Sequence, residues 1–284
     1  MSITVCAFIK KENNYIDEWL SHHLSIGVDK FIIYDNNDGR EDYPMTEYVS
    51  KQVMQKKVKI IYKRNEHLDK KTELKKLYEM CNTDWMILLG IDEFIKLNNR
   101  ITINEWLSQE KFSDITNIKI SVRSFNDNEL IYCDDNHNVI SRFNQISFKK
   151  NPFNHCSKTI MRTHVDDIID ISDFGLKAPN IKTAYCDGNF TSINITDFAL
   201  EDFSEIEIDA YPTKSLEEYC FIKVGRNLEY DEAKVKRYKE KYFEINNKTS
   251  EKEQMFDYFI SKVYKNETTK RVLHSYAEFN FGNG

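Results

Sequence analysis

Residues 84–97 read DWMILLGIDEFIKL, and this stretch decides the fold. Residues 85–89 form a continuous apolar run, which is typical of a β-strand buried on both faces of a sheet. Two acids, Asp92 and Glu93, follow this run, and the apolar pair Phe94 and Ile95 comes directly after them. Because an unpaired charge inside a protein is strongly unfavourable, we expect the acids to lie in a protein-lined crevice and to meet a cation there.

Strands and helices alternate through the first hundred residues. The apolar pattern predicts strands at 3–9, 30–38, 58–63 and 85–91, separated by helices at 14–26, 45–56 and 69–81. This alternation with short turns predicts an α/β fold with a mostly parallel sheet flanked by helices. Ligands of such sheets bind beyond the carboxyl ends of the strands. The segments at those ends are polar: KKENN, YDNNDGR, KRNE and GIDEF.

The pattern changes after residue 97. A capping box predicts a short helix at 102–109, and residues 117–124 alternate as a strand. Shorter β segments are predicted near 130–133, 138–148, 157–163, 181–186 and 205–209, and two further capping boxes predict helices beyond residue 213. We therefore expect one α/β domain at 1–212, in two halves at 1–97 and 98–212, with a C-terminal helical appendage at 213–284 packed on it.

Composition restricts the class of protein. The 284 residues are 40% apolar and 30% charged, as in ordinary globular domains. No apolar run approaches the ~20 residues of a membrane span, and the N-terminal residues lack the features of a signal peptide. Six cysteines without a CxxC pair predict a reduced, cytoplasmic protein. The net charge of −6, without a sustained basic stripe, argues against nucleic acid as a partner.

Glycine is scarce in this chain. Its eight glycines build neither a GxGxxG nor a Walker loop. If the protein binds a nucleotide, a metal ion or basic side chains must therefore neutralise the phosphates. The same absence argues against a nucleotidyltransferase, which would need a glycine-rich basic loop where this chain has KKENN.

Several polar residues are candidates for that chemistry. Asp92 and Glu93 offer the hard oxygen ligands that select Mg²⁺ or Mn²⁺. Lys158 and Arg162 share one face of the predicted strand KTIMR and could hold a diphosphate or an anionic acceptor. Asp35, in YDNND, is either a turn residue or a contact to a nucleobase.

Two carboxylates in polar loops are candidates for a general base that activates an acceptor hydroxyl. The first choice is Asp127 in SFNDNE, and the second is Asp187 in CDGN. Both positions are also compatible with plain turn residues. His22 and His23 lie on the first predicted helix, where one of them is expected to face the core with a hydrogen-bond partner.

Three blocks of this sequence occur together in one known group of enzymes. They are CAFIKKENNYIDEWLSHHLSIGVDKFIIYDNND at 6–38, DWMILLGIDEFI at 84–95 and AYPTKSLEEYCFIKVGRN at 210–227. In this order they resemble the GT-A glycosyltransferases, and within them the family 2-like and family 92-like group with its "W….DiDEF" and "HY.tKS.eEf" motifs. The three blocks span residues 6–227.

The resemblance implies a function and a GT-A-like fold. It implies transfer of a hexose from a nucleotide-diphosphate sugar, with UDP as the expected nucleotide, to a hydroxyl of a glycan acceptor, with inversion. Residues 1–97 would be the nucleotide-sugar-binding half and 98–212 the acceptor-binding half. It further implies a role in bacterial surface polysaccharide synthesis, with an acceptor that could be lipid-linked and a protein that could associate peripherally with the inner face of the membrane.

The resemblance also implies roles for individual residues. Asp35 with Asn36 would contact the base, and Asp92 would be the surviving acid of a DxD-type motif that binds Mn²⁺ or Mg²⁺. The remaining donor-pocket residues would be Lys10, Glu12, Lys214 and Lys223.

Two departures from the group's pattern bear on the metal. Gly90 stands where relatives often have Asp, and Ala210, next to Asp209, stands where they have His. Either Asp92 with Glu93 or Asp209 holds a weaker ion, or lysine and arginine side chains replace it. A catalytically degenerate, sugar-nucleotide-binding protein is the alternative function.

Overall fold

The computed structural model describes residues 1–37, 45, 49, 57–64, 66–99, 101–134, 137–147, 157–185, 203, 205–226 and 230–265. The chain divides into two compact units. The first unit consists of Met1–Arg123 and Pro152–Ala210, and the second of Ser124–Asn151 and Tyr211–Gly284. The predicted boundary at 212/213 differs from this division, because residues 124–151 join the second unit.

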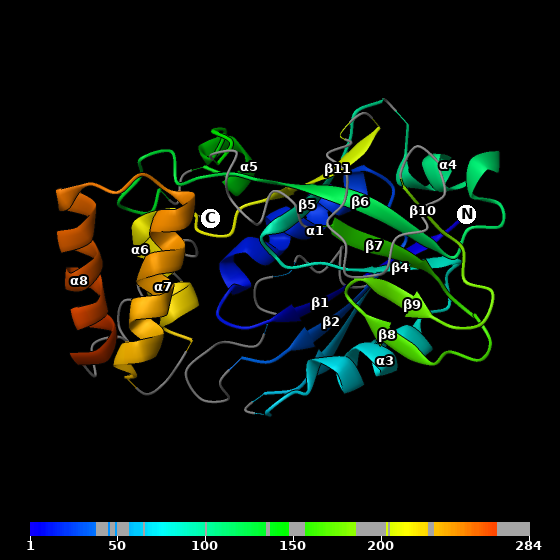
Figure 1. Ribbon diagram of the computed structural model, residues 1–284, viewed down its shortest axis with the longest axis horizontal. Helices are drawn as coiled ribbons and strands as arrows, with labels where there is room; N and C mark the ends of the chain where they lie inside the picture. Colours follow the sequence, from blue (N-terminus) through cyan, green and yellow to red (C-terminus); the bar gives the residue numbers. More distant parts are fainter. Residues whose placement is uncertain are drawn as a thin grey trace. The chain divides into compact units, whose positions relative to one another are not determined.

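A mixed, mostly parallel sheet forms the first unit (Figure 1). Its strand order is β3-β2-β1-β4-β7-β6-β11-β5, with β10 beside β6. In chain order the strands are β1 Ile3–Ile9, β2 Lys30–Asp35, β3 Val58–Tyr62, β4 Trp85–Leu88, β5 Glu93–Leu97, β6 Asn117–Ser124, β7 Ser157–Arg162, β10 Thr183–Tyr185 and β11 Ile206–Ala210. Strands β1 to β4 are parallel to one another, as predicted, whereas β7 is antiparallel to both β4 and β6.

Helices cover both faces of the parallel part. Trp19 of α1 (Ile16–Ser25) packs against Phe31 of β2, with ring centroids 5.7 Å apart. The next residue of β2, Ile32, faces the opposite side and joins the cluster beneath α3 (Lys70–Met80). Helix α3 begins at a side-chain cap, where Asp69 accepts the backbone N–H of Thr72 at 2.9 Å.

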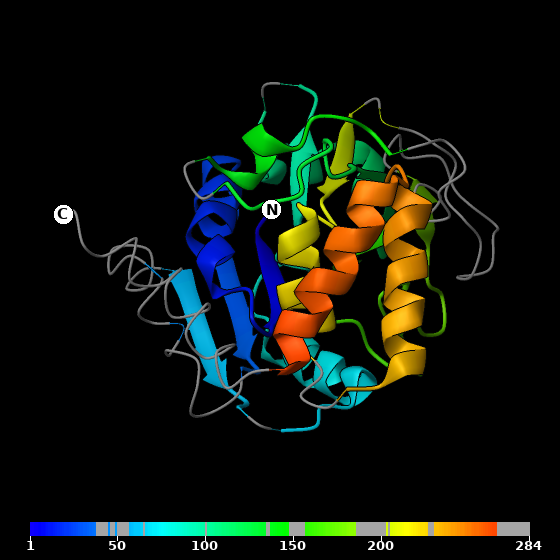
Figure 2. The same ribbon diagram turned by 90° about the vertical axis from the view of Figure 1, so that its left-hand side faces the viewer.

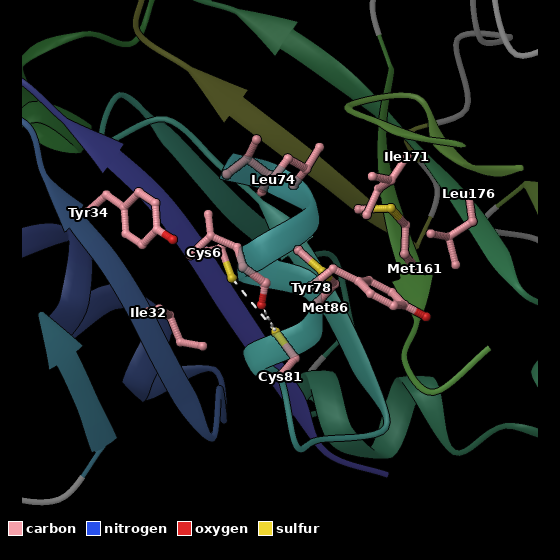
Figure 3. Close-up of a cluster of buried hydrophobic side chains, with 12 residues drawn as sticks. Cys6, Ile32, Tyr34, Leu74, Tyr78, Cys81, Met86, Met161, Ile171 and Leu176 are labelled. Atoms are coloured by element: carbon pink, nitrogen blue, oxygen red, sulfur yellow. Dashed lines mark hydrogen bonds between the residues drawn. The ribbon is translucent and has the colours of Figure 1, made fainter. Parts of the chain in front are cut away.

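Figure 3 shows the core beneath α3. The hairpin of β8 (Asp170–Ser172) and β9 (Gly175–Lys177) adds Ile171 and Leu176 to this core. The Sγ atoms of Cys6 and Cys81 lie 3.9 Å apart within it, and both cysteines are free thiols. The remaining short helices of this unit are η1 Asn13–Tyr15, α4 Ile103–Leu107 and η3 Glu110–Phe112. Helix α4 starts at the predicted capping box of Thr102 and Glu105.

Helix α1 also covers the free edge of β5, the last strand in the sheet order. Trp19 Nε1 donates to the carbonyl of Glu93 at 2.9 Å, and His22 Nε2 lies 2.7 Å from the carbonyl of Ile95. His23 Nε2 accepts the backbone N–H of Ile95 at 3.2 Å, while its Nδ1 lies 2.8 Å from the carbonyl of Trp19. Complete burial, with His22 beside it, lowers the pKa of His23 to about 3 despite the bond to Trp19. The imidazole is therefore neutral, and a buried histidine with a partner is confirmed.

The second unit is helical (Figure 2). It contains α5 Val139–Arg142, α6 Leu216–Glu218, the π-helical segment η5 Tyr219–Val224, α7 Glu232–Ile245 and α8 Ser250–Lys265. Its core lies between η5, α7 and α8 and includes Tyr219, Tyr242, Phe256 and Phe259. An ion pair of 2.6 Å between Lys239 and Asp257 joins α7 to α8. The predicted helical C-terminal region is thus confirmed for its described part.

Two predicted β segments, 130–133 and 138–148, are wrong. In the part of 124–147 beyond β6 that the structure describes, the β structure is limited to an isolated bridge between Phe125 and Ile146, and α5 occupies Val139–Arg142. In 130–133 the carbonyls of Leu130 and Ile131 accept the N–H groups of Leu216 and Glu217 at 3.1 and 2.9 Å. In 138–148 the physical reason is side-chain competition for the backbone. Asn128 donates to the carbonyl of Arg142 and accepts the N–H groups of Asn144 and Gln145, in place of a strand ladder. The predicted helix 45–56 lies outside the described residues except for positions 45 and 49.

Candidate functional site

A pocket of about 330 Å³ lies at the carboxyl ends of β1 and β4. The strand order reverses here, because the chain builds β1, β2 and β3 outward in one direction and then returns to place β4 on the other side of β1. Ligands of open α/β sheets bind at this switch point. The lining residues are Phe8, Leu68, Lys70, Leu88, Leu89, Gly90, Glu93 and Lys158.

The charged centre of the pocket is the pair Glu93 and Lys158. Glu93 Oε2 accepts the backbone N–H of Gly90 at 2.6 Å and lies 2.8 Å from Lys158 Nζ. Both side chains are largely buried, at 16% and 19% exposure. Burial by itself lowers the pKa of Lys158, but Glu93 outweighs it, with Asp173 and Asp92 adding to the rise. The lysine is therefore a fixed positive charge in the pocket.

Gly90 leaves room for the carboxylate of Asp92. A Cβ atom at position 90 would collide with Oδ1 of Asp92 and would touch Oε2 of Glu93 at 3.5 Å. Any other residue at position 90 would therefore require Asp92 to move. Glycine at position 90 and the position of the Asp92 carboxylate are therefore parts of one arrangement.

The expected metal ligands Asp92, Glu93 and Asp209 do not form one site. Glu93 lies opposite Ala210 in the antiparallel pair of β5 and β11, and Asp209 lies opposite Phe94. Because successive side chains of a strand alternate between faces, Asp209 and Glu93 point to opposite sides of this pair. Across the described ranges, no three His, Cys, Asp or Glu side chains are grouped closely enough to hold a metal ion. The donor set therefore does not fit Mn²⁺ or Mg²⁺.

Asp209 belongs to a separate polar cluster. Burial raises its pKa to about 6, although Lys96 Nζ lies 3.9 Å from its Oδ2 and acts in the other direction. Neighbouring Glu207 pairs with Lys96 at 2.7 Å and with Arg123 at 2.5 Å. This cluster connects β5, β6 and β11.

Asp35 and Asn36 form hydrogen bonds with other residues of the protein. Asp35 is fully buried, and its Oδ1 accepts the backbone and side-chain N–H groups of Asn37 at 3.1 and 2.7 Å. Its Oδ2 lies 3.3 Å from Arg64 Nε. Asn36 donates to the carbonyls of Lys63 and Glu66 and so joins the ends of β2 and β3. The structure places both residues at the predicted edge of the sheet.

The residues after β1 are held by the same network. Asn37 accepts the backbone N–H of Lys11 at 2.6 Å and donates to Asn13 at 2.7 Å. Lys10 is half-buried and Glu12 is buried, both at the carboxyl end of β1.

The side chains of Lys158 and Arg162 lie at different ends of β7. Arg162 pairs with Trp85, the first residue of β4, while its guanidinium stacks on the Trp85 ring and donates to the carbonyls of Phe112 and Ile115 at 2.9 Å each. Four residues of strand separate it from Lys158, or about 13 Å. Lys158 lines the pocket, and Arg162 holds the segment before β6.

Asp127 is enclosed within the second unit. Its carboxylate is 2.7 Å from Lys252 Nζ and accepts a hydrogen bond from the hydroxyl of Tyr242, while its backbone N–H donates to Asn246 at 2.7 Å. The residue is 1% exposed. These contacts tie the loop after β6 to α7 and α8. The second candidate base, Asp187, lies outside the described residues.

Residues of the late sequence block are also in the second unit. Lys214 is buried with a left-handed φ of 54°, and Lys223 is half-buried in η5. Glu218 of this block forms a two-pronged ion pair with Arg142, at 2.8 and 2.9 Å, and the ring of Tyr211 stacks on Phe125 with centroids 5.0 Å apart. The late block thus packs against residues 125–143.

Sequence reasoning missed two charged residues near the pocket. Lys70, which lines it, is ion-paired with Asp173 of the hairpin between β8 and β9. The capping signal at Asp69 could have indicated that Lys70 begins a helix at the sheet edge. Asp173 had no such signal, because its strands are three residues long.

Comparisons with known proteins find similarity to solved structures, at low sequence identity. No protein-family model and no curated protein sequence matches the chain. Among solved structures it is similar to S. aureus TarS at 11% identity, covering 98% of this chain and 53% of that one with a TM-score of 0.41. It is similar to TarS 1–349 in complex with UDP at 10% identity, covering 95% and 73% with a TM-score of 0.38.

A third similar structure is the mannosyltransferase PcManGT from Pyrobaculum calidifontis in complex with GDP-Man and Mn²⁺. Its identity is 12%, with 43% of this chain and 35% of that chain covered and a TM-score of 0.32. This chain thus spans about a third of the length of the PcManGT chain and about half of the longer TarS chain. Within the described ranges, no helix has the length and apolar character needed to cross a membrane.

Proposed function

We propose that this chain binds a nucleotide-diphosphate sugar, with UDP as the nucleotide, in the pocket between β1 and β4. It transfers the hexose to a hydroxyl of a glycan acceptor, with inversion at the anomeric carbon. The observation that carries the proposal is the Glu93–Lys158 pair, which places a fixed ammonium at the switch point of the sheet. The DEF block that carries Glu93 is also the block that resembles glycosyltransferases.

The pocket combines the properties that such a reaction needs. Phe8, Leu68, Leu88 and Leu89 give it apolar walls that exclude water and strengthen electrostatic interactions inside. As the bond to the hexose breaks, negative charge develops on the departing diphosphate. A preorganised ammonium next to that charge stabilises the transition state. Lys158 is placed for this task without a change of position, because Glu93 holds it.

The acceptor and the cellular setting follow from the sequence resemblance alone. We propose a glycan acceptor of a bacterial surface polysaccharide, presented on a lipid carrier at the inner face of the membrane. Residues 98–212 would supply the acceptor side.

A non-catalytic sugar-nucleotide-binding protein is the second candidate. The observation that favours it is Asp127, whose carboxylate is engaged by Lys252 and Tyr242 rather than open to an acceptor. Binding of the donor would be the same in both cases, and only turnover distinguishes them.

The test is a thermal-shift screen of UDP and UDP-hexoses followed by an assay of UDP release. At 100 times its dissociation constant, a ligand adds about 2.7 kcal/mol to the free energy of unfolding. Leu68→Trp would fill the pocket and should weaken binding at least about tenfold. Ile181→Trp is the matched control, because Ile181 packs partly buried against the same core without lining the pocket.

Release of UDP from one UDP-hexose would support the transferase, and tight binding without release would support the second candidate. If none of the nucleotides shifts the melting temperature, or Leu68→Trp leaves binding intact, the proposed function is wrong.

A further inference from the structure

We infer that the ammonium of Lys158 takes the place of a divalent metal ion in this pocket, so that the protein binds its donor without a metal. This inference rests on the proposed function for the identity of the ligand, and on the described geometry for the role of the lysine.

The first step is the position of the ammonium. Lys158 Nζ lies 2.8 Å from Glu93 Oε2, and the backbone N–H of Gly90 fixes that same oxygen from the other side at 2.6 Å. A lysine ammonium has three N–H donors, and one of those of Lys158 is directed to Glu93. Glu93 therefore does not take up the other two donors of Lys158. Because Lys158 lines the pocket, they are within reach of a ligand there.

The second step is the charge around it. The side chains of Lys158 and Glu93 are only 19% and 16% exposed, so the interaction between their charges is weakly screened by solvent. A buried ammonium held by a carboxylate supplies at this position the positive charge that a divalent ion would otherwise bring to the pocket. Lys70 also lines this pocket and is a second lysine there, ion-paired with Asp173.

The third step is competition. A metal ion that bound Glu93 would have to displace a covalently tethered cation, and it would leave a buried ammonium without its partner. The residues that could compensate are not in place: Gly90 has no side chain, and Asp209 faces the other side of the β5–β11 pair. Glycine at position 90, alanine at position 210 and the lysine at position 158 are therefore all explained by a pocket that uses an ammonium in place of a metal ion.

The experiment has two arms, and the first needs no nucleotide. Mn²⁺ alone is titrated into the wild type, Lys158→Met and the control Lys182→Met, with the unbound ion followed by electron paramagnetic resonance. Lys182 is an exposed lysine whose ion pair with Asp114 lies outside the pocket lining. We expect no saturable site in the wild type or the control, and tighter Mn²⁺ binding by Lys158→Met, which frees Glu93.

The second arm measures UDP binding by calorimetry in EDTA and in excess Mn²⁺. We expect the wild-type affinity to be the same in both, to fall about ten- to hundredfold in Lys158→Met, and to be largely retained in Lys158→Arg, which keeps the charge. Far-UV circular dichroism and melting curves establish that the variants fold. If Lys158→Met alone does not fold, the double variant Glu93→Gln/Lys158→Met replaces it, because it also removes the carboxylate that the single change leaves without its lysine.

The two proposals fail in different ways. A micromolar Mn²⁺ site in the wild type that Asp92→Asn abolishes would overturn the role of Lys158, whether or not UDP binds. UDP binding that requires Mn²⁺ and is indifferent to Lys158→Met would overturn it as well while leaving the proposed function intact. Absence of UDP binding in both buffers, with no Mn²⁺ site in the wild type, would instead contradict the proposed function.

Discussion

Asp92 and Glu93 are adjacent in the chain but have different surroundings. Glu93 is held between the N–H of Gly90 and the ammonium of Lys158, and the ion pair offsets the cost of burying its charge. Asp92 is half-buried, with one oxygen over the vacant side-chain position of Gly90. In this structure Glu93 therefore binds a lysine, and Asp92 belongs to the turn after β4.

At the same scale, His23 makes stability depend on pH. Its pKa is about 3 in the folded protein, whereas an exposed histidine titrates near 6.5. Below pH 6.5 the unfolded chain takes up a proton that the folded protein does not. Stability therefore falls as the pH falls from 6.5 towards 3, by up to about 1.4 kcal/mol per unit. Above pH 6.5 this contribution is constant.

We expect the stability advantage of the wild type over His23→Gln to shrink by about 1 kcal/mol between pH 7 and pH 5.5. Urea unfolding at the two pH values measures it. His137→Gln is the control, because His137 is exposed and lies 2.8 Å from Asp134, three residues earlier in the chain. An advantage that is equal at both pH values would show that His23 does not remain neutral.

At the scale of elements, side chains hold the ends and edges of strands. The free edge of β5 is covered by Trp19, His22 and His23 of α1, which bond its backbone groups. An uncovered strand edge would present unsatisfied N–H and C=O groups. In the second unit, Asp127 does the comparable task for the loop after β6 by binding Lys252 of α8 and Tyr242 of α7.

Asp127→Asn should lower the free energy of unfolding by about 3 kcal/mol, because it removes one carboxylate from a buried ammonium. Glu129, 2.7 Å from Lys252, limits the loss. Urea denaturation of the two proteins gives the difference. Asp257→Asn is the matched control, since it also removes an acid paired with a lysine of these helices but is 68% exposed, and it should cost less than about 1 kcal/mol. Equal effects of the two substitutions would contradict the anchoring role of Asp127.

At the scale of the whole molecule, the proposed function assigns donor binding and turnover to different residues. The pocket residues of the first unit would hold the donor, whereas the general base is predicted at Asp127 or, as the second choice, at Asp187. With Asp127 enclosed by its own unit, Asp187 is the carboxylate that we now expect to act on the acceptor hydroxyl.

Asp187→Asn should lower the rate of UDP release about 100- to 10,000-fold while leaving the affinity for UDP unchanged, because a general base acts on the transition state rather than on donor binding. Initial rates and calorimetric titrations of the same preparation separate the two effects. Asp166→Asn, a change in an exposed loop, serves as the control. A parallel loss of affinity and rate would place Asp187 in donor binding instead.

How much could be predicted varied with the range of the interactions. Strands β1 to β4 and helices α1 and α3 were predicted because their apolar periodicity is local and strong. Strand β5 and the hairpin of β8 and β9 were not, since they are short and are stabilised by partners far along the chain, such as Ile208 opposite Ile95. The predicted strand at 138–148 failed because the side chain of Asn128 bonds backbone groups that a strand would have paired. The one at 130–133 failed because the carbonyls of Leu130 and Ile131 accept the N–H groups of Leu216 and Glu217.

By itself, the sequence determined the α/β class, the parallel order of the first strands and the edge of the sheet where Asp92, Glu93 and Asp35 lie. These properties follow from hydrophobic periodicity and from the direction of parallel strands. Only the tertiary structure decided which cation meets Glu93, that Asp209 faces away, and that Arg162 and Asp127 are anchors. The reason is that an ion pair such as Glu93–Lys158 joins residues distant in the chain, and strand register and side-chain packing select it.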